Sequence, residues 1–360
     1  MKFIYTFSLS IHTTLSWLPK SLRPIPTIIL AFLLLLSCQQ AQEQIEAITH
    51  NGAYKTLHCN PVNVKEIPLF GNSDLLLQNN LLYCIDYGQE EQILAFEILG
   101  SKARLIGKAA PMGKGPGEFG YVSGLKAYEK KCYFFDSMHQ KVYWLKDTCC
   151  SLFTDLSDFP ETITEVCLLD TNHMIIAGIF EKHRFIQINK EGEIQSTYTE
   201  FPDKQHPDMP IQLKNMGFIS NFITHGRTIC NVVYDSGIIA FYESKNKTIK
   251  LIERKIYNQN RFEKQTIEGT TIVKHADNNT GFLDIQISRG QCYALYSGTS
   301  WAENSELAAY GHWLLVYDLK GKHQQTYYLE EAISSFAIED KQIIGMGSLE
   351  GTPILLRYSI

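Results

Sequence analysis

The sequence lacks the short motifs that mark common catalytic and metal sites. Its 11 histidines are scattered, with no H-x-x-x-H, no H-E-x-x-H and no Cys/His quartet at zinc spacing. It also has no G-x-S-x-G nucleophile elbow and no G-x-x-x-x-G-K-[ST] phosphate loop. We therefore predict no metal site, no cofactor and no catalytic residue, although side chains distant in the sequence can still converge in a fold.

Strong charge and long polar tracts are also missing. The chain has 33 basic and 38 acidic residues and a net charge of −5, so it offers no concentrated basic surface for nucleic acid. Its 24 glycines and 12 prolines are spread out, which indicates no long disordered tract. Aromatic residues are abundant instead, with 19 Tyr and 19 Phe, and this composition favours strands over helices.

One apolar run near the N-terminus is too short to cross a membrane. Ile25–Ser37 spans about a dozen residues, whereas a spanning helix needs roughly 20. Two basic residues precede the run, and the pattern predicts a secretory signal peptide over residues 1–37. Its end, Leu35-Leu36-Ser37-Cys38, resembles the lipobox of bacterial lipoproteins, in which the peptide is cut before the cysteine and the thiol is lipidated.

The lipobox resemblance implies that Cys38 carries the lipid. Several acyl chains on one cysteine hold a protein at a membrane without a spanning helix. Gln39 rather than Asp follows, and by resemblance to sorting in enteric bacteria this favours the outer membrane, on its periplasmic side or at the cell surface. The alternative is a buried cysteine at the end of a short transmembrane anchor. Residues 38–56 are polar and predict a flexible tether.

From about Leu57 onward, one pattern recurs six times. A short run of aromatic or β-branched residues precedes a polar turn and a second such run. The six pairs are 81–86 with 93–98, 131–136 with 141–145, 173–178 with 184–188, 228–234 with 237–242, 291–296 with 312–317, and 342–347 with 353–358. Corresponding points recur every roughly 40 to 60 residues, and propeller blades have periods of roughly 40 to 50. We predict an all-β, six-bladed β-propeller over residues 57–360.

The ring of a propeller must be closed where its chain ends, because an open sheet exposes faces and edges. We expect a strand within Leu57–Leu69 to complete the blade that contains the C-terminal strand Pro353–Ile360. Insertions at 200–217, 255–281 and 298–311 would shape a binding surface. The alternative architecture is a pair of β-sandwiches, which requires no sixfold repeat.

The most distinctive joint is the loop GKGPGEFG at Gly113–Gly120. Four glycines and a proline in eight residues exclude helix and regular strand and allow several positive φ angles. This loop, the lipobox and the late stretch Trp313–Lys322 resemble the TolB-like six-bladed β-propeller lipoproteins of Bacteroidetes, which carry G-x-G-P-G-E-F between their first two blades. The resemblance spans the mature chain and implies the fold and an envelope location, but no settled activity.

Two groups of residues are candidates for ligand binding. The first is the glycine loop, with the N–H groups of Gly115 and Gly117, the charges of Lys114 and Glu118, and the ring of Phe119. In the structural alternative, the Glu118 carboxylate ties down neighbouring N–H groups and Phe119 fills a gap between blades. The second candidate is Trp301, as a stacking platform for a sugar or as a loop anchor packed on its blade.

We hypothesise a lipid-anchored envelope module that binds a ligand or partner through its loop face without catalysis. The expected partner is a glycan, peptide or envelope protein, and the chain is expected to be a monomer. The alternative is a hydrolase or lyase that acts on glycans or envelope substrates at the central channel. Convergent carboxylates or histidines in the channel would favour the enzyme, and a flat or aromatic loop surface would favour binding. A third hypothesis, a structural partner in an envelope complex, requires a broad exposed apolar patch.

Overall fold

The chain divides into two compact units, Met1–Gly52 and Ala53–Ile360. The computed structural model describes residues 46–49, 52–64, 69, 74–202, 206–259, 261–267, 270–275, 279–302 and 304–360. The predicted signal peptide and Cys38 lie outside the described residues. Among the helices that are described, none is both long and apolar enough to cross a membrane.

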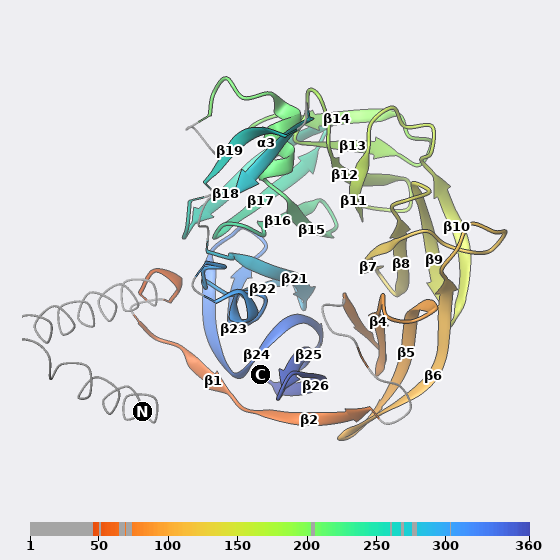
Figure 1. Ribbon diagram of the computed structural model, residues 1–360, viewed down its shortest axis with the longest axis vertical. Helices are drawn as coiled ribbons and strands as arrows, with labels where there is room; N and C mark the ends of the chain where they lie inside the picture. The colour runs from red at the N-terminus through yellow and green to blue at the C-terminus, as the bar shows by residue number, and fades with distance from the viewer. Residues whose placement is uncertain are drawn as a thin grey trace, which may run out of the picture. The chain divides into compact units, whose positions relative to one another are not determined.

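The second unit consists of four-stranded blades that follow one another around a common centre (Figure 1). The described strands, from the innermost to the outermost of each blade, are β3 (Leu75–Gln78), β4 (Leu81–Ile85), β5 (Glu91–Leu99) and β6 (Lys102–Pro111) in blade 1; β7 (Val122–Tyr128), β8 (Lys131–Asp136), β9 (Lys141–Lys146) and β10 (Cys149–Asp155) in blade 2; β11 (Ile163–Leu168), β12 (His173–Gly178), β13 (Phe185–Asn189) and β14 (Ile194–Tyr198) in blade 3; β15 (Ser220–His225), β16 (Thr228–Val233), β17 (Ile238–Lys245) and β18 (Thr248–Ile256) in blade 4; β21 (Phe282–Ser288), β22 (Gln291–Tyr296), β23 (Gly311–Asp318) and the first part of β24 (His323–Glu339) in blade 5; and the last part of β24, β25 (Gln342–Leu349), β26 (Thr352–Ser359) and β2 (Cys59–Val64) in blade 6. Each predicted pair of runs forms the second and third strands of one blade. The prediction of a six-bladed propeller is therefore confirmed, and the sandwich alternative is wrong.

Two features join the blades at the ends of the chain. Strand β24 pairs with β23 over its first part and with β25 over its last part, so blades 5 and 6 share one strand. Strand β2, which lies in the range predicted for the closing strand, pairs antiparallel with β26, with Cys59 opposite Tyr358. Its last residues pair in parallel with β6 of blade 1. The short β1 (Lys55–Leu57) lies parallel to β24.

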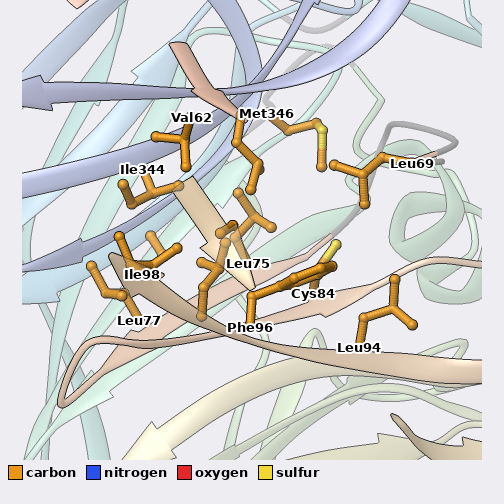
Figure 2. Close-up of a cluster of buried hydrophobic side chains, with 14 residues drawn as sticks. Val62, Leu69, Leu75, Leu77, Cys84, Leu94, Phe96, Ile98, Ile344 and Met346 are labelled. Atoms are coloured by element: carbon orange, nitrogen blue, oxygen red, sulfur yellow. The ribbon is translucent and has the colours of Figure 1, made fainter. Parts of the chain in front are cut away.

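The core lies between the stacked faces of neighbouring blades. In β4, Leu82 and Cys84 face a cluster shared with blade 6, which includes Val62, and Figure 2 shows Cys84 and Val62 within it. The residues between and after them, Tyr83 and Ile85, face the cluster shared with blade 2. All four β4 side chains are less than 5% exposed. Burial of both faces explains why the runs are almost continuously apolar instead of alternating.

Candidate functional site

The connections of the blades divide between the two faces of the ring. In a four-stranded antiparallel blade, the turn between strands 2 and 3 and the link to the next blade emerge at the same end. We call this end the loop face. All three predicted insertions belong to it, and their described elements are α3 (Ile211–Gly217), β19 (Phe262–Ile267), β20 (Thr270–His275) and α4 (Ser305–Ala308). The glycine loop, which links β6 to β7, emerges at the same face.

A cavity of about 260 Å³ opens at the loop-face end of the central channel. Its walls come from the innermost strands of blades 1 to 5, from the loops before them, and from the turns that carry Tyr87 and Tyr234. Its ionisable side chains, apart from tyrosines, are three carboxylates and one ammonium, from Asp74, Lys126, Glu165 and Asp284. Side chains of four blades thus meet in one site.

β-bulges direct three of these side chains. The inner strands β7, β11 and β21 each change register against their neighbour within a step or two of Lys126, Glu165 and Asp284. A bulge turns a residue away from the regular alternation of the strand and is common beside functional sites. Strand β24 has the corresponding shift just before Ser335. The ionisable residues therefore occupy equivalent positions in three blades.

Lys126 and Glu165 form an ion pair across the boundary between blades 2 and 3. The two side chains are 9% and 15% exposed, so the pair is largely shielded from solvent. Burial lowers the pKa of Lys126, but the Glu165 carboxylate outweighs it and holds that pKa above its ordinary value. Burial raises the pKa of Glu165, and the Lys126 charge opposes that shift. The Lys126 ammonium is therefore protonated at neutral pH and engaged by Glu165.

Asp74 and Asp284 accept hydrogen bonds from backbone N–H groups of neighbouring blades. The Asp74 Oδ2 atom accepts from Gly124 at 3.0 Å, and the Asp284 Oδ2 atom accepts from Phe336 at 2.9 Å. Asp284 is 8% exposed, and burial raises its pKa to about 7, with a further contribution from the Asp74 charge. The N–H bonds from Phe336 and Ile285 act in the opposite direction. Near neutral pH, the Asp284 carboxyl group is therefore divided between its acid and its anion.

Two tyrosines stand at the rim of the cavity. The rings of Tyr87 and Tyr121 are stacked, with centroids 4.6 Å apart and an interplanar angle of 10°. The Tyr87 hydroxyl donates to the carbonyl of Val122 at 2.7 Å, and burial raises the pKa of this phenol. Both residues are still more than a third exposed, so they present an aromatic surface at the mouth.

The glycine loop is folded upon itself by Glu118. The Glu118 Oε2 atom accepts from the N–H of Gly115 at 2.7 Å, as the structural alternative expected. A Cβ atom on Gly113 would lie 2.0 Å from the same oxygen, so a larger residue here would displace the Glu118 carboxylate from this position. Gly117 has φ +81°, a left-handed conformation that also favours glycine. Lys114 is exposed.

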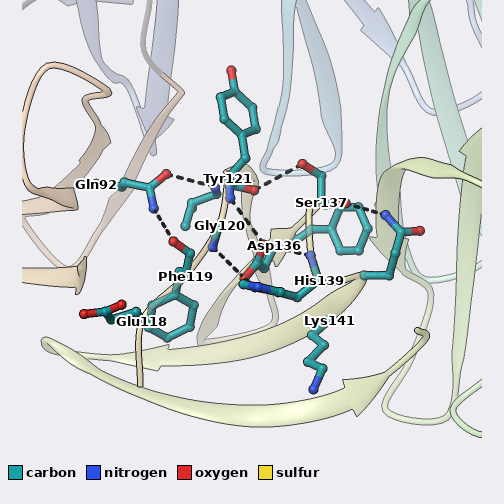
Figure 3. Close-up of polar contacts among 12 residues, drawn as sticks. Gln92, Glu118, Phe119, Gly120, Tyr121, Asp136, Ser137, His139 and Lys141 are labelled. Carbon is teal, nitrogen blue, oxygen red and sulfur yellow. Dashed lines mark hydrogen bonds and ion pairs between the residues drawn. The ribbon is translucent and has the colours of Figure 1, made fainter. Parts of the chain in front are cut away.

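The end of the loop is anchored in blades 1 and 2, and Figure 3 shows its polar contacts with Gln92 and Asp136. Phe119 is 6% exposed, and its ring meets Tyr143 edge to face at 4.9 Å. The buried Gln92 donates to the Phe119 carbonyl at 3.4 Å, and the buried Asp136 accepts from the N–H of Gly120 at 3.1 Å. The ring of Phe119 thus packs between the blades.

None of the ligand-binding candidates predicted from the sequence lines the channel cavity. Trp301 lies in the insertion that contains α4 and is 43% exposed. The sequence prediction missed the ionisable channel residues because no motif contains them. A weaker signal exists, since Lys126 and Asp284 each interrupt a short apolar run. Among the described residues, no group of three or more His, Cys, Asp or Glu side chains is placed to hold a metal ion.

Comparison with known proteins gives one family and several related folds. A family model described as TolB-like 6-blade propeller-like matches residues 73–341. A member of the DUF4221 family from Bacteroides vulgatus aligns over 85% of this chain and 96% of its own, at TM-score 0.54 and 7% identity. BamB from Moraxella catarrhalis aligns over 84% of this chain and all of its own, at TM-score 0.42 and 7% identity. No curated protein sequence matches the chain.

Proposed function

The chain belongs to the TolB-like six-blade propeller family, and we propose that it binds a small polar ligand at the loop-face end of its channel. The ligand would be the end of a glycan or peptide, and the protein would bind it without catalysing a reaction. The observation that carries this proposal is the convergence of three carboxylates and one lysine on one cavity of about 260 Å³. A space of this size suits one sugar unit or one amino-acid side chain better than a larger molecule.

The free hydrogen-bonding capacity of the cavity indicates the chemistry of the ligand. The Lys126 ammonium already pairs with Glu165, so the site offers an anion little. From the described residues, Asp74 accepts one backbone N–H bond and Asp284 accepts two, whereas a carboxylate has about four acceptor sites. The site therefore favours hydroxyl or ammonium donors. The tyrosine pair at the rim suits the apolar face of a sugar ring.

A second candidate function is acid–base catalysis in the same cavity. Convergent carboxylates are the feature that the sequence reasoning assigned to a hydrolase or lyase, and Asp284 supports it specifically. With a pKa of about 7, its carboxyl group can donate a proton near neutral pH while Asp74 lies within electrostatic reach. The hydrogen bonds that Asp284 accepts from Phe336 and Ile285 favour the simpler binding role, because they hold the carboxyl group in place between blades.

The location of the protein is part of the same proposal. Lipid on Cys38 would anchor the chain in the cell envelope, at the outer membrane, and the propeller would act as a monomer. The lipobox sequence at residues 35–38 supports this, together with the short apolar run before it. The propeller would then present the loop face to glycans, peptides or envelope proteins, and not to nucleic acid.

Saturation-transfer NMR on the full chain in detergent tests the binding role. The probes are two mixtures, one of neutral and amino monosaccharides and one of dipeptides with Ser or Lys. We expect binding from at least one mixture and a loss of tenfold or more in Asp74→Asn. Glu118→Gln, at the same face but outside the cavity, is the control and should bind normally. Absence of binding, or equal binding by Asp74→Asn, would refute the channel site.

The same preparation tests the catalytic candidate. Chromogenic glycosides are incubated with the wild type and with Asp284→Asn over pH 5 to 9. Product release that depends on pH near 7 and is abolished by Asp284→Asn would establish catalysis. Binding without product release would leave the non-catalytic function as the correct one.

A further inference from the structure

A second cavity lies between blades 3 and 4, at the loop face. Its volume is about 370 Å³, and its lining is mostly apolar. One cation belongs to this lining, the guanidinium of Arg184, which directly precedes β13. Arg184 is 4% exposed, so its charge lies in the protein interior.

All the side-chain partners that the structure gives Arg184 are neutral. Nη1 donates to the hydroxyl of Tyr242 at 3.1 Å, and Nη2 donates to Asn231 Oδ1 at 2.9 Å. The guanidinium also lies over the rings of Phe201 and Phe218, at 5.7 and 5.9 Å from their centroids. Within the described part of the chain, no carboxylate forms an ion pair with it. These bonds use two of the five N–H donors of an arginine.

A buried guanidinium needs compensation for the water it has lost. Arginine stays protonated in proteins, so burial cannot neutralise it. Two cation–π contacts and two neutral hydrogen bonds recover part of the lost solvation, but they supply no opposite charge. The carboxylate of Glu200, in the same aromatic region, bonds the Tyr198 hydroxyl at 3.2 Å instead of the guanidinium. Among the described residues, the guanidinium therefore has no opposite charge beside it.

We propose that this cavity binds a molecule with one carboxylate on an apolar body. The carboxylate would accept from the unused N–H donors of Arg184, because a guanidinium presents them in a fork that matches a carboxylate. The body would lie against the apolar wall, which includes Ile179, Phe218 and Phe222. A single cation among apolar side chains suits a monoanion better than a phosphate, which carries nearly two charges near neutral pH.

This site is separate from the channel site in both position and chemistry. The channel cavity offers acceptors, whereas the Arg184 cavity offers donors and a positive charge. Ile219 and Ser220 line both cavities, so the two sites are neighbours at the loop face. Helix α3, from the insertion after blade 3, supplies Asn215 and Met216 to the Arg184 cavity. The insertion thus builds a wall that the blades alone lack.

Matched pairs of probes test the proposal on the full chain in detergent. Phenylacetate and hexanoate are compared with phenylacetamide and hexanamide, by saturation-transfer NMR and by the thermal stabilisation that a bound ligand causes. We expect at least one carboxylate to bind tenfold or more tightly than its amide. The proposal would be overturned if acid and amide bind equally. It would also be overturned if neither acid binds at about 10 mM, where even weak binding is detectable.

Variants locate the binding. Arg184→Gln should abolish the preference for the carboxylate, but it also removes contacts between blades 3 and 4. Ile179→Trp provides a second variant that leaves Arg184 intact and fills the cavity from its 39% exposed rim. Its matched control is Ile252→Trp, a 41% exposed position on β18 outside the lining. Loss of carboxylate binding in Ile179→Trp with retention in Ile252→Trp supports the site, and retention in both overturns it.

Discussion

Val62 of β2 lies opposite Leu355 of β26 in an antiparallel ladder. This ladder joins the N-terminal strand of blade 6 to the C-terminal strand of the chain, both in the same blade. Both side chains are 1% exposed and belong to the cluster between blades 6 and 1. The few residues of β2 therefore contribute packing at the place where the ring would otherwise open. This contact makes the closure of the propeller testable.

We expect Val62→Ala to destabilise the propeller by about 2 kcal/mol, because it leaves a cavity at the closing ladder. Urea unfolding followed by circular dichroism measures the change. Asn60→Ala, on the same strand but exposed, should change the free energy of unfolding by less than about 0.5 kcal/mol. Equal effects of the two variants would mean that β2 adds little to the stability of the ring.

The glycine loop can be examined by a double-mutant cycle. Gly113→Ala alone places a Cβ atom against the Glu118 carboxylate and should cost about 1 to 2 kcal/mol. In the Glu118→Ala background the obstructing atoms are gone, so Gly113→Ala should cost clearly less. Gly117→Ala is the control, since its cost of about 1 kcal/mol comes from φ and should be the same in both backgrounds. Strict additivity at Gly113 would show that Glu118 does not hold the loop.

The ion pair in the channel should be strongly coupled. Lys126→Met leaves the Glu165 carboxylate largely buried without its partner and should cost about 3 kcal/mol. The double variant Lys126→Met, Glu165→Gln should recover part of that loss, because no unpaired charge remains. Thermal or urea unfolding of the wild type, Lys126→Met, Glu165→Gln and the double variant gives the coupling energy. A coupling energy near zero would mean that solvent screens the two charges, as at an exposed ion pair.

The raised pKa of Asp284 predicts how stability depends on pH. The group is protonated in the folded state up to about pH 7 and in the unfolded state only to about pH 4, so the unfolded state binds fewer protons in between. Asp284 therefore makes the folded state less stable as the pH rises from about 4 to 7, by up to about 4 kcal/mol. Asp284→Asn should be the more stable protein at pH 8 and lose this advantage near pH 4. Asp340→Asn, which removes a carboxylate at an exposed position, is the matched control, and a pH dependence equal to that of Asp284→Asn would contradict the prediction.

Lipidation of Cys38 can be tested in cells that process lipoproteins. Cys38→Ser should abolish labelling by an alkyne fatty acid and release the chain from the membrane fraction. Cys59→Ser, in β2, the outermost strand of blade 6, should keep both the label and the membrane location. Persistent labelling of Cys38→Ser would show that another residue carries the lipid, and would contradict the lipobox prediction.

The architecture was predictable because it is repeated. Every blade stacks on two neighbours, so its second and third strands are buried on both faces and become short, nearly continuous apolar runs. The same burial therefore produces the same pair of apolar runs in each of the six blades. The turn residues agree with it, as at Asp318, whose carboxylate accepts the N–H groups of Lys320 and Lys322 in the turn after β23.

The two cavities were not predictable, because they depend on contacts between blades. Asp74 and Asp284 are separated by more than 200 residues, and Arg184 meets Asn231 of the next blade. A bulge changes the direction of a side chain on an inner strand, and so determines whether a charged group points into the channel or along a blade. The neighbouring residues in the sequence do not show where a bulge lies. The sequence by itself thus determined the second and third strands of each blade, the number of blades and their order, through burial. The tertiary structure alone decided which polar side chains meet, because the ring brings together residues that are remote along the chain.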